Sequence, residues 1–240
     1  LATILSQGFL FLAAVRNMNQ KGNAFGFSIR AISFNSQVIK PMLYLSFPVI
    51  IEKIAFSLGK VVVNSMSAVY GSWTVGALGI SNNIGGITTM PQNGFQEGGS
   101  AVISQNLGAG KPRRAFAAFW WILAINAFLG FFLMGLSLLF LDQLALFFAG
   151  DNLQFAEMIK DIYRYEAMGA VPLGINSAVL GLLYGFGKTR ITLLMNFCRV
   201  FVFRIPVLWW LQNFTNFGRE SAGIVMAVSN ILSGLLAAAV

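Results

Sequence analysis

The stretch of residues 73–114 constrains this chain most, because it is long enough to cross a membrane as one helix and yet carries many polar side chains. At about 100° per residue, apolar residues such as Ile84, Ile87 and Phe95 lie mostly on one side. The opposite arc contains Asn82, Thr89, Asn93, Gln96, Ser100 and Ser104. In lipid such a polar stripe is costly unless it faces water or other helices. We therefore expect it to line a cavity or pathway; the alternative is that its amides only join helices by hydrogen bonds.

The composition indicates a membrane protein. Of 240 residues, 57% are hydrophobic and only 10% are charged, whereas a soluble domain carries about a quarter charged residues. Histidine is absent and Cys198 is the single cysteine, which excludes His-based catalysis, imidazole metal sites and an intrachain disulfide. We therefore expect no enzyme activity, no metal site and no cofactor. The net charge of +8 fits basic cytoplasmic loops better than nucleic-acid binding.

Six apolar segments predict six complete transmembrane helices, at residues 41–70, 73–107, 114–141, 161–186, 191–211 and 221–240. Residues 1–15 are too short to span, as expected for the tail of a preceding transmembrane helix. Residues 16–40 are predicted to be a cytoplasmic linker between bundles, and residues 41–240 to form one six-helix bundle. Residues 142–160 are predicted to be an outer, acidic loop. The predicted fold class is an all-α, polytopic membrane protein.

The loop charges predict the orientation of these helices. Alternate loops hold the basic residues Arg16, Lys21, Arg30, Lys40, Lys111, Arg113, Arg114, Lys188 and Arg190. The intervening loops hold Lys160 and Arg219 together with the acidic residues Asp142, Asp151, Glu157, Asp161 and Glu220. Because cytoplasmic loops of membrane proteins carry excess Lys and Arg, the first set is predicted to be cytoplasmic.

Four charged side chains are predicted to share one layer of the bundle. With a rise of about 1.5 Å per residue, Glu52, Lys53, Glu97 and Arg199 lie roughly 12–18 Å from the cytoplasmic ends of their helices. Glu97, on the polar stripe, is a candidate ligand for a coupling cation or a cationic substrate, with Glu52 as a second candidate. The alternative is that Glu97 is the fixed counter-charge of Lys53 or Arg199.

Other polar residues inside the predicted helices extend this picture. Lys60 and Glu166 are predicted to form a second charged level, roughly 30 Å from the cytoplasmic side. Arg204, like Arg199, is interpreted as a structural counter-ion rather than an anion ligand. Asn64 and Asn176 are further candidates for the cavity wall.

Two glycine patterns have different meanings. Gly94, Gly98 and Gly99 are expected to let neighbouring helices approach closely. The sequence GFGKT at residues 185–189 resembles the end of a P-loop, but the first glycine of that motif is replaced by Leu182. ATP binding is therefore not supported, and energy for any transport must come from an ion gradient or a partner protein.

One segment resembles a known family. The sequence SQNLGAGKPRRA at residues 104–115 resembles the signature G-Q-N-x-G-A-G-x-x-x-R-A, which ends the second or eighth helix of multidrug and toxic compound extrusion (MATE) transporters. The matching residues are Gln105, Asn106, Gly108, Gly110 and Arg114. Three further segments resemble the family's helices seven, ten and eleven: SFPVIIEKIAFSLGKVVVNSMSAVYG, GLLYGFGKTR and FRIPVLWWL. The chain thus resembles the C-terminal half of such a transporter.

The resemblance implies a fold of two six-helix bundles, of which this chain supplies the second and its missing N-terminal half the first. It implies an antiporter that exchanges Na⁺ or H⁺ for cationic amphipathic drugs or metabolites by alternating access, here expected in the lipid of a bacterial plasma membrane. The family often has glutamine at the position of Glu97, so a charge there departs from its pattern. Two alternatives stay open: a related flippase for lipid-linked oligosaccharides, with a larger and more basic cavity, and a membrane scaffold that transports nothing.

Overall fold

The computed structural model describes residues 2–20 and 35–240, and these form helices with no strand, which confirms the predicted all-α class. The chain divides into two compact units, Leu1–Leu43 and Tyr44–Val240. The first unit contains α1 (Ala2–Met18), an apolar helix shorter than a membrane span, and the start of α2 (Ser36–Ser67). Residues 21–34 of the predicted linker lie outside the described residues.

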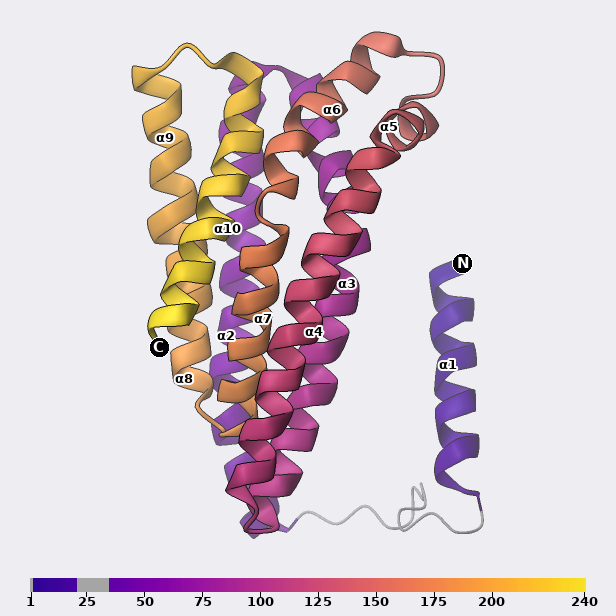
Figure 1. Cartoon of the computed structure of the whole chain (residues 1–240), viewed down its shortest axis with the longest axis vertical. Helices are drawn as coiled ribbons and strands as arrows, with labels where there is room; N and C mark the ends of the chain where they lie inside the picture. Colours follow the sequence, from indigo (N-terminus) through magenta and orange to yellow (C-terminus); the bar gives the residue numbers. More distant parts are fainter. Residues whose placement is uncertain (1, 21–34) are drawn as a thin grey trace. The chain divides into compact units, whose positions relative to one another are not determined.

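The second unit is a bundle of helices (Figure 1). After α2 and a short 3₁₀ turn η2 (Ala68–Tyr70), its elements are α3 (Ser72–Gly108), α4 (Pro112–Leu139), α5 (Leu141–Ala149), α6 (Leu153–Ala167), α7 (Ala170–Gly185), α8 (Thr189–Phe197), the π-helix η3 (Cys198–Arg204), α9 (Ile205–Phe214), η4 (Gly218–Glu220) and α10 (Ser221–Ala239). Helix α7 packs against α3, α4 and α10, and α3 also packs against α4 and α6.

Among the described residues, three continuous stretches are long and apolar enough to cross a membrane: Pro112–Leu139, Thr189–Phe214 and Gly218–Ala239. Helices α6 and α7 pass the same test together, although they are bent by 51° at their junction. The 32 residues of α2 and the 37 residues of α3 are long enough, but both carry charged or polar side chains. The predicted count of six spans therefore stays a prediction.

The stretch predicted as an outer loop, residues 142–160, is instead helical. It contains most of α5 and the first half of α6, and the predicted span 161–186 is broken between α6 and α7. The side chain of Asn152 caps α6 by accepting a hydrogen bond from the Phe155 N–H at 2.9 Å. Ile159 and Ile162 of α6 are fully buried, while Glu157 and Arg164 of the same helix are exposed. The loop was predicted because residues 142–160 contain many charged side chains, although their apolar residues repeat at helical spacing.

Close packing of α3, α4 and α7 depends on glycine. A Cβ on Gly130 of α4 would lie 2.9 Å from the Ala170 carbonyl oxygen, and one on Gly174 of α7 would lie 2.6 Å from that of Asn126. Gln92 of α3 fills this junction and donates hydrogen bonds from Nε2 to both carbonyls, at 3.0 and 3.1 Å.

The glycine prediction on α3 was only partly right. Gly99 lies against Ile122 of α4, and a Cβ there would lie 2.3 Å from the Ile122 Cδ1. Gly94 and Gly98 face open space, with no neighbouring helix atom within 4 Å of a Cβ position. Sequence spacing alone does not reveal which glycines of a helix meet a neighbour.

The turns divide into two sets at opposite ends of the bundle. The basic α3–α4 and α7–α8 turns lie at the lower end in Figure 1, and α5 and the α9–α10 connection lie at the upper end. Acidic residues at the upper end pair locally: Lys160 Nζ contacts Asp142 and Glu157 at 2.8 and 2.7 Å, and Arg219 contacts Asp161 at 3.0 Å. The two sets of loops thus lie at opposite ends of the bundle, and the cytoplasmic location of the basic end stays a prediction.

Candidate functional site

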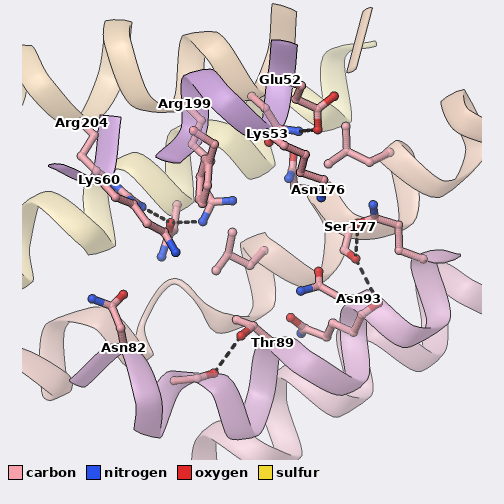
Figure 2. A pocket seen from close by; sticks show the side chains of 18 of the residues that line it. Glu52, Lys53, Lys60, Asn82, Thr89, Asn93, Asn176, Ser177, Arg199 and Arg204 are labelled. Atoms are coloured by element: carbon pink, nitrogen blue, oxygen red, sulfur yellow. Dashed lines mark hydrogen bonds between the residues drawn. The ribbon is translucent and has the colours of Figure 1, made fainter. Parts of the chain in front are cut away.

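A cavity of about 300 Å³ opens inside the second unit, between α2, α3, α6, α7, the segment from α8 through η3, and α10. Figure 2 shows its polar side chains converging from these helices. Ten of the residues predicted from the sequence to lie on the pathway or to serve as charge partners line it: Glu52, Lys53, Asn82, Thr89, Asn93, Gln96, Glu97, Asn176, Arg199 and Arg204. The polar stripe of α3 therefore forms one wall of a cavity.

Two predicted wall residues lie outside the cavity lining. Ser100 is one turn beyond the last lining residue of α3 and donates a hydrogen bond to the Glu97 carbonyl at 2.8 Å. Asn64 is one turn beyond Lys60 on α2 and is exposed. Both side chains lie next to the cavity and not in its lining, and their role in a transport pathway stays a prediction.

Glu52 is held by hydrogen bonds rather than by a base. Its carboxylate accepts hydrogen bonds from Tyr184 at 2.7 Å, Asn196 at 2.8 Å and Thr192 at 3.0 Å, and the residue is only 4% exposed. These neutral donors come from α7 and α8. They stabilise the carboxylate in place, because each bond to an ionised acceptor is stronger than one between neutral groups.

Glu97 differs from Glu52 in having an open carboxylate. It lines the same cavity and is exposed, and none of the ion pairs in the described part of the chain includes it. The expected pairing with Lys53 or Arg199 is therefore not formed. Tyr184, which donates a hydrogen bond to Glu52, also lies within electrostatic reach of Glu97.

Basic side chains gather at the other end. Figure 2 shows Lys60, Arg199 and Arg204 close together on one side of the cavity. Nη2 of both arginines donates to one acceptor, Oδ1 of Asn230 in α10, at 3.0 Å from Arg199 and 3.2 Å from Arg204. The two arginines, interpreted from the sequence as counter-ions of acids, are thus joined mainly through a neutral amide.

The π-helix η3 explains why the two arginines converge. Residues five apart point about 140° away from each other on an α-helix. The wider turn of a π-helix brings such residues towards one face, and π segments inside α-helices occur frequently at functional sites. Arg199 and Arg204 are five apart within η3, so both reach the cavity.

Sequence reasoning had not assigned several wall residues to the site. Ser177 donates from Oγ to Gln96 Oε1 at 2.9 Å, which ties the α3 stripe to α7. Glu166 accepts a hydrogen bond from the Ser81 hydroxyl and lines the basic end. Lys60 and Glu166 carried a usable signal, since both are charged residues inside predicted spans. Asn196 and Asn230 gave none, because single amides are common in helices.

The signature turn lies outside the cavity and caps helices. Ala109 N–H donates to Gln105 O at 3.0 Å, and Lys111 N–H donates to Asn106 O at 2.8 Å around Gly110, whose φ is 68°. Such a left-handed residue after a helix favours glycine. The α7–α8 turn repeats this arrangement: Lys188 N–H donates to Leu183 O at 2.8 Å, and Gly187 has a φ of 70°. Gly108 is the last residue of α3, and the Arg114 N–H donates to Lys111 O at 3.1 Å in the first turn of α4.

No group of three potential metal-ligating side chains occurs within residues 2–20 and 35–240. The side chains that line the cavity carry charged groups, amides and hydroxyls. These groups can recognise a solute or ion by hydrogen bonding and charge.

Comparison with known proteins identifies the family. A curated relative, Protein DETOXIFICATION 29 of Arabidopsis thaliana, is 28% identical over 133 residues, which are 55% of this chain and 26% of that protein. An outward-facing structure of a multidrug resistance MATE family transporter of the MOP superfamily aligns with a TM-score of 0.86 at 16% identity, covering 98% of this chain and 53% of its own. An inward-facing structure of such a transporter aligns with a TM-score of 0.72 at 15% identity, covering 93% and 52%.

These similarities differ in what they establish. At such low identity the solved structures show a shared fold, and the chain spans about half of their length. The MatE family model matches residues 48–210, which is more than half of the chain and includes most of the cavity wall. The chain therefore belongs to the MatE family of multi-pass membrane transporters.

Proposed function

We propose that this chain forms the second bundle of a cation-coupled antiporter that exports organic solutes by alternating access. The observation that carries the proposal is the open carboxylate of Glu97 on the wall of a polar cavity within an apolar bundle. An ionisable group at such a position is expected to have a partner, and the described residues supply no ion pair for it. A mobile cation is the partner that fits.

Members of this family are transporters and not enzymes, in agreement with the absence of histidine from the chain. Residues 41–240 are proposed to be the bundle, residues 16–40 the cytoplasmic linker and residues 1–15 the end of the preceding helix. A complementary N-terminal half would complete the transport pathway. The exposed aromatic side chains of α4, such as Phe128, Phe131 and Trp121, are proposed to contact lipid. Residence in a bacterial plasma membrane stays a prediction.

Glu97 is the first candidate for the coupling site, and Glu52 is the second. Three hydrogen bonds already occupy the Glu52 carboxylate, so a cation there would have to displace or share its donors. Glu97 needs no such rearrangement. Na⁺ or H⁺ is proposed to bind Glu97 in exchange for a cationic amphipathic solute, because both compete for the same negative charge.

The two alternatives receive less support. A flippase for lipid-linked oligosaccharides needs room for a long chain of sugars, whereas the cavity within this bundle measures about 300 Å³, at the lower limit of pockets for drug-sized ligands, and further room would have to come from the N-terminal half. A scaffold without transport activity would not belong to a family of transporters.

The test is transport by the full-length protein in proteoliposomes. Ethidium efflux driven by an imposed Na⁺ or H⁺ gradient is expected in the wild type and is expected to be lost in Glu97→Gln, which keeps the shape but not the charge. The matched control is Glu157→Gln, whose carboxylate lies outside the cavity and pairs with Lys160. Equal efflux by the wild type and Glu97→Gln would exclude Glu97 as the coupling site.

A further inference from the structure

The basic end of the cavity carries more positive charge than its surroundings balance. Lys60, Arg199 and Arg204 line it, and none of the ion pairs among the described residues includes any of them. Glu166 lies within electrostatic reach of all three. Even with Glu166 ionised, three positive charges face one negative charge, which leaves an excess of two.

The arginines also retain hydrogen-bond donors. Arg204 donates from Nε to Ser229 at 3.1 Å and from Nη2 to Asn230, while Arg199 donates from Nη2 to Asn230. Nε of Arg199 is buried and has no hydrogen-bond partner in the described part of the chain. Each guanidinium offers five N–H donors, so the shared amide oxygen satisfies only a small part of them. The unused donors need an acceptor that the described residues do not supply.

The surroundings favour an acceptor on an organic molecule. The ring of Phe56 lies under both Lys60 Nζ, at 5.0 Å from its centroid, and the Arg199 guanidinium, at 5.6 Å. Leu173 and Leu180 of α7 add apolar surface to the same cavity. Planar guanidinium groups match carboxylate and sulfonate oxygens, and a neighbouring aromatic ring can pack against the apolar part of the ligand.

We propose that Lys60, Arg199 and Arg204 form a subsite for the anionic group, a carboxylate or sulfonate, of an amphipathic organic solute. The proposal rests on the transport function proposed above and deepens it, because it adds solutes with an acidic group to the substrate class. Asn230 holds the two arginines at a common position, and η3 turns both of them into the cavity.

The test is equilibrium binding to the purified full-length protein in an uncharged detergent, without any ion gradient. The probe is the fluorescent dye 8-anilinonaphthalene-1-sulfonate, and N-phenyl-1-naphthylamine serves as its uncharged counterpart. Lys60→Gln is expected to weaken sulfonate binding about tenfold, since one charge-assisted contact is lost, and to change binding of the uncharged dye less than about twofold. Lys60→Arg is expected to retain sulfonate binding.

Lys111→Gln is the matched control, because it removes the same charge from the exposed α3–α4 turn. Lys60 is exposed to the cavity, so its replacement is compatible with folding, which size-exclusion chromatography checks. Equal sulfonate affinity in the wild type and Lys60→Gln overturns the subsite. An equal loss in Lys111→Gln also overturns it, because the effect would then be one of net charge.

Two further arms separate organic solutes from other oxyanions. Benzenesulfonate is expected to displace the dye at lower concentration than inorganic sulfate; equal displacement would make this a site for inorganic anions and overturn the proposal. In nanodiscs, loss of dye binding only when phosphatidylglycerol is present would assign the site to lipid headgroups, with the same consequence. Ethidium has no acidic group, so its efflux tests the coupling proposal independently of the subsite. Ethidium efflux without specific sulfonate binding would contradict only the subsite, and sulfonate binding without ethidium efflux would contradict only the coupling proposal.

Discussion

The two ends of the cavity handle charge in opposite ways. At one end Glu52 is surrounded by three neutral donors, all from segments far along the chain. At the other end two arginines share a single amide oxygen of Asn230, and Lys60 adds a third positive charge. The difference teaches that burial of a charge does not by itself mark a ligand site. A carboxylate whose hydrogen bonds are satisfied by the protein is held in place, whereas basic groups with unsatisfied donors can accept an anionic ligand.

The strongest way to break this comparison is to remove the donors of Glu52. Tyr184→Phe combined with Thr192→Val is expected to lower the free energy of unfolding by about 2–4 kcal/mol, because a buried carboxylate would keep only the Asn196 donor. The measurement is an SDS titration of the full-length protein in mixed micelles. In a Glu52→Gln background the same pair of substitutions is expected to cost less. An equal loss of unfolding free energy in both backgrounds would show that the donors do not act through the charge of Glu52.

A smaller effect is expected at the basic end. Asn230→Ala removes the acceptor shared by Arg199 and Arg204 and is expected to lower the free energy of unfolding by about 1–3 kcal/mol. Asn93→Ala, an exposed amide on the opposite wall, is the control and is expected to change it by less than about 0.5 kcal/mol. The same titration measures both. A negligible effect of Asn230→Ala would mean that the arginines need no internal acceptor.

The smallest effect is expected for a charge pair outside the cavity. The hydrogen bond from Lys160 lowers the pKa of Asp142 below its usual value of 3.8. A carboxyl group whose pKa is lowered by folding stabilises the protein above its unfolded pKa, and this contribution is lost as the pH falls through the folded pKa. Asp142→Asn is therefore expected to give only a slight decrease in melting temperature at pH 7, and none at a pH below the folded pKa.

Melting curves of the wild type and Asp142→Asn across this pH range check the sign. A difference in melting temperature that grows as the pH falls would contradict a stabilising interaction between Asp142 and Lys160. Because Asp142 is exposed to water, this pair serves as the reference against which the cavity charges are compared.

The sequence predicted the parts of the site that follow a regular period. The polar stripe of α3 was found from residue spacing, because a regular α-helix converts spacing into direction, and Asn82, Thr89 and Asn93 all line the cavity. The basic end was not predicted, since its geometry depends on a π-helix that changes the period locally. The same limit applied to Glu52, whose three donors are 132 to 144 residues away in the chain. A single sequence does not tell which distant side chains meet.

The fold was predictable to a similar extent. Helical class and family membership followed from composition and from the turn at residues 104–115, and the family model confirmed the second. The helical structure of residues 142–160 was not predicted, because the charged residues of α6 favoured a loop and the helical spacing of Ile159 and Ile162 was not considered. Amphipathic helices at a membrane surface are less apolar than spans, so hydropathy finds them poorly.

The π-helix also changes how the number of residues between two side chains determines the angle between them. Each of the seven residues of η3 turns the chain by less than the roughly 100° that an α-helical residue contributes. A regular α-helix with the same residues would turn Arg204 about 140° away from Arg199, whereas loss of one residue between them would leave them four apart and about 40° from each other. The π-helix thus accommodates one extra residue between the two arginines while both still face the cavity.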